Sequence, residues 1–462
     1  MNERILFSVL FVLVLFLAAM VVLGLRSRRY NATFESSITA GRASSFLLVA
    51  ASAVGAHIGS GFVVGGAEQG AGFGLGGAWY GACCGLSFVI AGLFLGKVFR
   101  RLPCVSISEY LYQRYQNRVT PLIYSVSNIF SGFSLVAGQL LAGKVLFSAV
   151  GIDGSLGVIL MAVTAFLFVT FSGMWGVLAA SALQSAIIAI GMVASLVMVT
   201  KQQGITILIQ SLPDTYFSFQ PYDWETFVQL TVPTVVFAQI SQFCFQRFAS
   251  ADSERSAVWG HVLGGALLIP LALVPALLGM YGRALFPDVP DGEVFIRLLA
   301  DQLPAALAGL LIAAILCAII SSCNSVFLLI DTCFVNDIWK EMLRPAASEK
   351  EMRRLSVICN AFTCLVGIGL TLTNDSILTM MSFAYTFMIS GCLVPFFGGL
   401  IWKRPGPGAA AASAAAGIFT AALYAVDLVP IPFGSIFPIL PSLFVYIFAA
   451  FLLRPFKGES VL

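Results

Sequence analysis

The sequence predicts an all-α, polytopic membrane protein with about thirteen transmembrane helices, and three observations lead to this prediction. Of the 462 residues, 59% are hydrophobic and only 10% are charged, whereas soluble domains are about half apolar and about a quarter charged. Apolar stretches long enough to cross a bilayer recur along the whole chain. The lysines and arginines gather in alternate segments between these stretches, as the loops on one side of a membrane require.

Each apolar stretch is a candidate span, because the hydrocarbon core of a bilayer requires about 20 residues of helix. The first stretch is too long for a signal peptide and no small-residue cleavage site follows it, so we interpret it as a retained peripheral anchor helix. The thirteen candidates are 5–26, 44–70, 74–99, 120–150, 155–172, 175–200, 227–248, 257–282, 304–336, 355–373, 376–402, 408–427 and 434–454.

The basic residues predict the orientation. With the N-terminus outside, 20 of the 25 lysines and arginines fall in segments on the inner side, 4 fall outside, and Lys144 lies within a helix. Positive charge marks the cytoplasmic loops. A single missed helix would invert every later loop and destroy this asymmetry. We therefore predict a multi-pass protein of the inner (plasma) membrane with a cytoplasmic C-terminus.

The composition also excludes several classes of function. The longest connecting segments, near 201–226, 283–303 and 337–354, leave no room for a nucleotide-binding or kinase domain. The net charge of +3 gives no sign of nucleic-acid binding, and the ten cysteines show no metal-binding spacing and are interpreted as buried thiols. We expect no enzymatic activity and no obligatory protein partner, so the expected partners are the lipid bilayer and small solutes.

The stretch VGAHIGSGFVVGG within the second candidate span has an unusual number of glycines for a membrane helix. Irregular backbone is tolerated at membrane depth only where it lines a cavity or is buried, and its freed carbonyls can bind a cation. One interpretation is therefore a helix broken at mid-membrane. The other is close helix packing, with Gly55, Gly59 and Gly66 along one face.

A second candidate feature lies in the span 304–336. Ala318, Ser321 and Ser322 follow an i, i+3, i+4 pattern and share one helix face. With the carbonyls of Gly55 and Ile58, their oxygen atoms would form a cage suited to a small hard cation. The alternative is that the serine hydroxyls hydrogen-bond back to carbonyls of their own helix.

Several segments together resemble the sodium:solute symporter family. They are the glycine-rich SSITAGRASS, the broken-helix candidate, RRLPCVSISEYLYQRY, SGMWGVLAASALQSAI, SQFCFQRFASADSERSA and AAILCAIISSCNSVFLLIDTCFVNDIWK. The resemblance covers about 40–400. It implies a LeuT-like fold with two inverted five-helix repeats, expected here at 44–200 and 227–402, and two peripheral C-terminal helices at 408–454. The thirteen spans would then form a single transporter domain.

The resemblance also implies a sodium site. The matching residues are the carbonyls of Gly55, Ile58 and Ala318 and the hydroxyls of Ser321 and Ser322, the same set as the cage inferred above. Sodium is thus the expected coupling ion. Some members place an aspartate in the fifth repeat helix for a second sodium, where this chain has Ser181, so we expect one sodium per solute.

His57 stands where proline carriers of the family have aspartate and galactose carriers have asparagine. Three roles remain open for it: contact with the solute, carriage of a coupling proton, or neutral packing. The sixth repeat helix offers Gln239, Ser241, Gln242 and Phe243 as solute-binding candidates. Phe243 is either a gate or an ordinary core side chain. The fold requires this helix to be broken too, yet it has no glycine at that point.

Further candidates lie nearer the two membrane surfaces. Tyr385 on the tenth repeat helix is expected to reach the solute, and Ser390–Gly391 is expected to break that helix as a flexing gate. Glu68 is expected either to line the outer vestibule or to face water. Asp331, at the inner end of its helix, is expected to meet an arginine.

We predict a sodium-coupled symporter that imports a small polar organic solute by alternating access. The solute is expected to be neutral, zwitterionic or monoanionic, because few charged residues face the candidate site. A proton-coupled or uncoupled carrier with a titrating His57 is the first alternative. A channel or a sensor that does not transport is the second, although no repeated subunit or filter ring favours it.

Overall fold

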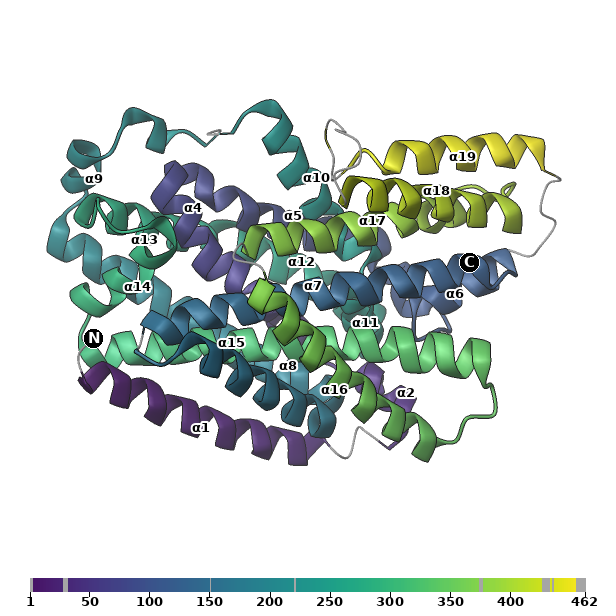
Figure 1. Cartoon of the computed structure of the whole chain (residues 1–462), viewed down its shortest axis with the longest axis horizontal. Coiled ribbons are helices and arrows are strands. Elements are labelled where there is room, and N and C mark those ends of the chain that lie inside the picture. Colours follow the sequence, from purple (N-terminus) through teal and green to yellow (C-terminus); the bar gives the residue numbers. More distant parts are fainter. Residues whose placement is uncertain are drawn as a thin grey trace.

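The computed structural model describes residues 3–27, 32–149, 151–219, 222–373, 377–425, 433 and 436–453. Over these residues the elements are helices, and the β-pairing is an isolated bridge between Ser44 and Ala251. Long helices run side by side along the long axis of the molecule (Figure 1). The predicted all-α class is confirmed.

The first half of the chain contains α1 (Glu3–Ser27), α2 (Phe34–Thr39), η2 (Ala40–Arg42), α3 (Phe46–His57), η3 (Ser60–Gly65), α4 (Gly66–Phe73), η4 (Gly74–Ala78), α5 (Trp79–Arg101), α6 (Ile107–Tyr115), α7 (Val119–Ala149), α8 (Gly154–Gln203), α9 (Thr206–Ser211) and η5 (Asp214–Phe217). The second half contains α10 (Trp224–Ile240), α11 (Gln242–Ser250), α12 (Glu254–Leu271), α13 (Leu273–Leu285), α14 (Asp291–Gln302), α15 (Ala305–Asp331), η6 (Thr332–Leu343), α16 (Glu349–Thr373), α17 (Ile377–Ile401), α18 (Pro407–Ala425) and α19 (Ile439–Leu452).

Each of the thirteen predicted spans contains helix in its described residues. Among the described residues, 8 helices are long and apolar enough to cross a membrane, or 9 when α10 and α11 count as one bent span. Others, such as α3 and α19, are apolar but shorter. The chain is therefore a multi-pass membrane protein, and the count of thirteen stays a prediction.

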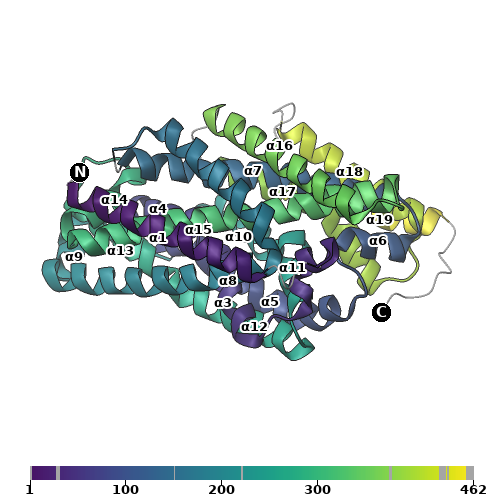
Figure 2. The same ribbon diagram turned by 90° about the horizontal axis from the view of Figure 1, so that it is seen from below.

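The core of the bundle is built around α15. Every residue from Leu311 to Asp331 is buried, which agrees with a helix that is apolar on all sides. It packs along α7 and α8, while α5 packs along α12 and α17 along α7. Figure 2 shows α1 on the outside of the bundle, where it contacts α8 and α15, as expected of a peripheral helix.

The glycine-rich segment is broken, as one interpretation predicted. α3 ends at His57, Ile58 (φ −70°, ψ 77°) and Gly59 (φ −138°, ψ −152°) leave the helical region, and the chain resumes as the π-helical turn η3. The close-packing interpretation is also confirmed at Gly55, because an added Cβ would lie 2.4 Å from the carbonyl oxygen of Ser181. The glycines thus serve both the break and a helix contact.

The sixth repeat helix is broken as well, although it has no glycine there. α10 and α11 meet at an angle of 44°. The residue between them, Ser241, adopts φ −77° and ψ 129°, an extended conformation open to any residue. The Tyr124 hydroxyl donates a hydrogen bond of 3.0 Å to the carbonyl of Ile240, just before the break. Side-chain satisfaction of freed backbone therefore replaces glycine at this break.

The predicted spans 155–172 and 175–200 meet at Gly173. Its backbone (φ 57°, ψ −172°) interrupts α8 in a region that side chains rarely adopt, so glycine is required there. The two breaks at Gly59 and Ser241 lie in the first helix of each predicted repeat. The repeat boundaries themselves stay a prediction.

Candidate functional site

A small cavity lies between the two broken helices. Its volume is about 40 Å³, which is room for a few water molecules but not for an organic solute. The lining side chains come from both breaks and from α5, α7, α15 and α17. They are Ala56, His57, Gly61, Phe62, Tyr80, Leu135, Gln139, Phe237, Phe243, Ser322, Val326, Met381 and Tyr385.

Three of the predicted solute-binding residues line this cavity, namely His57, Phe243 and Tyr385. His57 packs edge-on against Phe88 (ring centroids 5.0 Å apart) and Phe237 (5.7 Å). Its Nε2 is buried and has no hydrogen-bond partner in the described part of the chain. A ring nitrogen without a partner at a cavity wall is available to a ligand.

The other three solute-binding candidates, Gln239, Ser241 and Gln242 of the broken helix α10–α11, do not line the cavity. The Gln239 side chain donates to the carbonyl of Ser87 at 3.1 Å. Gln242 accepts from the Ile107 backbone at 3.0 Å and donates to the carbonyl of Val105 at 3.1 Å, which fixes the chain entering α6. Ser241 forms the helix break. In this conformation Gln239, Ser241 and Gln242 therefore have structural roles.

Sequence reasoning missed two lining residues with polar side chains, Tyr80 and Gln139. The Tyr80 hydroxyl on α5 lies 3.0 Å from the Tyr385 hydroxyl on α17, so the pair joins two helices across the cavity. Gln139 on α7 accepts a hydrogen bond of 3.4 Å from the backbone of Ser60, just after the first break. A glutamine in the middle of a long apolar span was the signal that could have identified Gln139.

Beyond Phe243, the structure is packed tightly toward α11. The guanidinium of Arg247 lies 4.0 Å from the centroid of the Phe243 ring and donates to its carbonyl at 2.9 Å. Arg247 also donates to Ser325 of α15 at 3.0 Å. Phe243 is thus held between the cavity and a buried, hydrogen-bonded arginine. This is the arrangement expected of a closed gate, and the gating role stays a prediction.

Three of the five predicted sodium-site residues, Gly55, Ser321 and Ser322, lie in the contacts between the broken helix, α8 and α15. Gly55 packs against the Ser181 backbone, and the Ser181 hydroxyl lies 2.9 Å from that of Ser321. Ser322 is 5% exposed. Its hydroxyl lies 2.9 Å from where a Cβ on Gly59 would stand. The hydroxyl has no hydrogen-bond partner among the described residues.

These contacts suit a site for a small hard cation, because every polar group in them is an uncharged oxygen. Ser322 also lines the central cavity. Ala318 lies one turn before Ser322 on the same face of α15, and Ile58 lies at the break itself. The back-bonding alternative does not describe Ser322, since its hydroxyl makes no hydrogen bond in the described chain.

The expected break at Ser390–Gly391 is wrong. α17 continues from Ile377 through both residues to Ile401. The Ser390 hydroxyl donates to the carbonyl of Thr386 at 2.5 Å. A Cβ on Gly391 would meet Ser127 at 2.8 Å, and one on Gly417 would lie 1.8 Å from the Ser390 carbonyl oxygen. The small residues therefore bring α7 and α18 close to an unbroken helix.

Glu68 lies on α4 and is half-buried beside α14, where its carboxylate is near Gly292. The neighbouring Asp291 forms an ion pair with Arg283. Glu68 therefore faces a helix and is not wholly in open water, and its role in a vestibule stays a prediction.

Comparison with known proteins agrees with this architecture. The profile of the sodium:solute symporter family matches residues 37–417. The chain is 28% identical to sodium/glucose cotransporter 4 of Danio rerio over 70% of its own length and 56% of that protein. It is 24% identical to the sodium/pantothenate symporter of Escherichia coli over 81% of the chain and 80% of that protein. The chain thus spans only about half the length of the glucose cotransporter that it matches.

The fold is similar to a solved structure, a substrate-bound, outward-open Na⁺-coupled sialic acid symporter. The TM-score is 0.79 over 98% of this chain and 99% of that one, at 19% sequence identity. This similarity confirms the predicted LeuT-like fold class. The relatives are transporters and not enzymes. Since the family profile covers most of the sequence and the fold agrees, the chain belongs to the sodium:solute symporter family.

Proposed function

We propose that this protein is a sodium-coupled symporter that imports a small polar organic solute by alternating access. The observation that carries the proposal is the meeting of the first helix break with α15. The buried Ser322 hydroxyl, which lacks a hydrogen-bond partner in the described chain, lies beside Gly59 there. Family membership and the sodium-coupled relatives support sodium as the coupling ion.

In this proposal sodium binds to the carbonyls of Gly55, Ile58 and Ala318 and to the hydroxyls of Ser321 and Ser322. It holds the break in α3 against α15. The protein binds sodium more tightly in a conformation that brings these oxygen atoms together. Sodium binding therefore favours the conformation in which α3 and α15 are in contact. Separation of α15 from the break would release the ion.

The solute would bind in the central cavity after it widens. His57, Gln139 and Tyr385 offer polar groups there, and Phe243 closes its floor. Ser322 belongs to both sites, and His57 is adjacent to Ile58. A shift of the break therefore changes the sodium ligands and the solute contacts together, which is the differential affinity that coupling requires.

One sodium per solute is the proposed stoichiometry. The second-sodium position holds Ser181, whose hydroxyl is already hydrogen-bonded to Ser321. No carboxylate is available at Ser181 to favour a second cation. We also propose the orientation inferred from the basic residues, with the N-terminus outside and the C-terminus in the cytoplasm.

Proton coupling through His57 is the second candidate. The observation that favours it is that His57 Nε2 has no hydrogen-bond partner among the described residues. Thermal stability of the purified protein in sodium, lithium and potassium chloride separates the two candidates. We expect stabilisation by sodium in the native protein and none in Ser321→Ala or Ser322→Ala.

Ser195→Ala is the matched control, because it removes a buried serine hydroxyl that donates to the Gly191 carbonyl of its own helix. We expect this variant to respond to sodium like the native protein. Equal melting temperatures in the three salts, with stability that depends on pH and loses that dependence in His57→Gln, would replace the sodium proposal with the proton one.

A further inference from the structure

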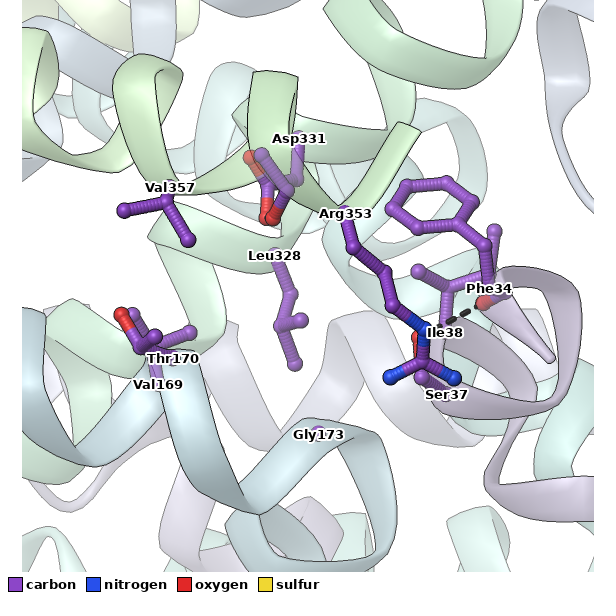
Figure 3. Close-up of a pocket in the computed structure, with 11 residues that line it drawn as sticks. Phe34, Ser37, Ile38, Val169, Thr170, Gly173, Leu328, Asp331, Arg353 and Val357 are labelled. Atoms are coloured by element: carbon purple, nitrogen blue, oxygen red, sulfur yellow. Dashed lines mark hydrogen bonds between the residues drawn. The ribbon is translucent and has the colours of Figure 1, made fainter. Parts of the chain in front are cut away.

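A second cavity lies apart from the central one, where α2, the end of α15 and the start of α16 meet the kink of α8. Its volume is about 340 Å³, within the range of cavities that hold small organic ligands. Figure 3 shows Asp331 on the α15 wall, Arg353 reaching down from α16, and Gly173 at the kink on the far side. No step of the proposed transport cycle uses this cavity.

Asp331 is one of the residues that line this cavity. The expectation that it meets an arginine is wrong, because its hydrogen bonds in the described chain go to uncharged side chains of α16, namely Ser356, Asn360 and Cys359. Its Oδ2 accepts from the Ser356 hydroxyl at 2.5 Å and from Asn360 Nδ2 at 3.1 Å. Its Oδ1 has no partner in the described part of the chain, and the side chain is only 2% exposed. A buried acceptor without a hydrogen bond destabilises the fold unless a ligand donates a hydrogen bond to it.

Three hydroxyl groups that line the cavity already donate hydrogen bonds within the protein. Ser37 donates to the carbonyl of Phe34 at 2.6 Å, and Thr170 donates to the carbonyl of Phe166 at 2.7 Å. The Ser356 hydroxyl donates to the carboxylate. A hydroxyl has one proton and two lone pairs, so all three now offer only acceptors. The inner wall therefore matches a cationic ligand group that carries several N–H donors.

The volume of the cavity and the charge at its rim indicate which other groups the ligand carries. A bare metal ion needs about six oxygens converging at about 2.0–2.6 Å, which a cavity of this volume with a single carboxylate does not provide. Arg353 supplies positive charge at the exposed rim, where its Nη2 also donates to the carbonyl of Ala32 at 2.9 Å. Leu328 and Val169 add apolar side chains to the lining.

We propose that this cavity is a second ligand site, which takes a primary ammonium group joined by a short aliphatic linker to an anion. The ammonium binds Asp331 Oδ1 and the anion lies toward Arg353. Two sources share this chemistry: the headgroup of phosphatidylethanolamine and a free amine such as O-phosphoethanolamine. A bound ligand ties the end of α15 to α2, α8 and α16.

The first arm of the test measures the melting temperature of the purified full chain with O-phosphoethanolamine. O-phosphocholine is the matched control, because its trimethylated nitrogen has the same charge and no N–H donors. We expect a saturable rise with O-phosphoethanolamine alone. In Asp331→Asn we expect its apparent affinity to fall at least about tenfold, since a charge-assisted hydrogen bond is lost. Asp252→Asn, an exposed carboxylate outside the cavity, should leave the rise unchanged.

The second arm identifies a lipid source. Native mass spectrometry of protein released from phosphatidylethanolamine/phosphatidylglycerol membranes should show one retained phosphatidylethanolamine, lost in Asp331→Asn. Either arm, positive in the native chain and lost in that variant, supports the site. Val357→Trp fills the cavity mouth without touching the carboxylate, so it tests the proposal even if Asp331→Asn fails to fold. An equal rise with both soluble probes, binding that persists in either cavity variant, or no binding in both arms would overturn the proposal.

Discussion

Substitution of Gly55 by alanine tests whether the contact between the broken helix and α8 is required for sodium binding. An added Cβ at Gly55 would lie 2.4 Å from the Ser181 carbonyl oxygen and 2.7 Å from its carbon, whereas ordinary contact begins at 3.4 Å. The obstacle is backbone, so α3 and α8 must separate by about 1 Å. Overpacking of this kind costs about 1–3 kcal/mol. The same displacement moves the Gly55 carbonyl away from Ser321.

Gly65→Ala is the matched control on the same broken segment. Its added Cβ would lie 3.7 Å from the Ser60 carbonyl oxygen, which is ordinary contact. We expect Gly65→Ala to keep the native melting temperature and the native sodium response. We expect Gly55→Ala to melt lower and to gain no stability from sodium. If both variants gained equal stability from sodium, the reasoning about the α3–α8 contact would be refuted.

Two further predictions concern the second break and the segment around α6. Tyr124→Phe removes the hydroxyl that donates to the Ile240 carbonyl. We expect the free energy of unfolding, measured by denaturant titration, to fall by about 1–3 kcal/mol. A change below about 0.3 kcal/mol would contradict the role given to this hydroxyl in the break. Burial raises the pKa of Glu109 above its ordinary value of 4.5. The folded state therefore holds the proton more tightly, and stability falls as pH rises from 4.5 through the folded pKa. Glu109→Gln should abolish this fall in melting temperatures measured from pH 4 to 8, and an unchanged pH profile would contradict the assignment.

The first helix break was predictable because its signal is local. Glycines near mid-membrane lower the cost of leaving the helix, and Gly55 and Gly59 do so within five residues. The second break was not predictable from its own residues. Ser241 adopts an ordinary extended conformation, and the group that satisfies the freed backbone, Tyr124, comes from a helix more than 100 positions away.

The same contrast separates the two candidate sites. Ser321 and Ser322 stand three and four residues after Ala318, so their place on the same helix face as Ala318 followed from periodicity alone. Gln139 and Tyr80 reach the cavity only because α5 and α7 pack beside the breaks, which no pattern within either helix encodes. Glycine was also misleading at Gly391, where it permits close contact with α7 and not a break.

Binding of radioactive sodium to the purified protein tests the central claim most directly, because it requires no knowledge of the solute. The account predicts one saturable site per chain in the native protein and in Ser195→Ala, and loss of that site in Ser322→Ala. Sodium binding that is equal in Ser322→Ala and the native protein would contradict the placement of the ion between the broken helix and α15.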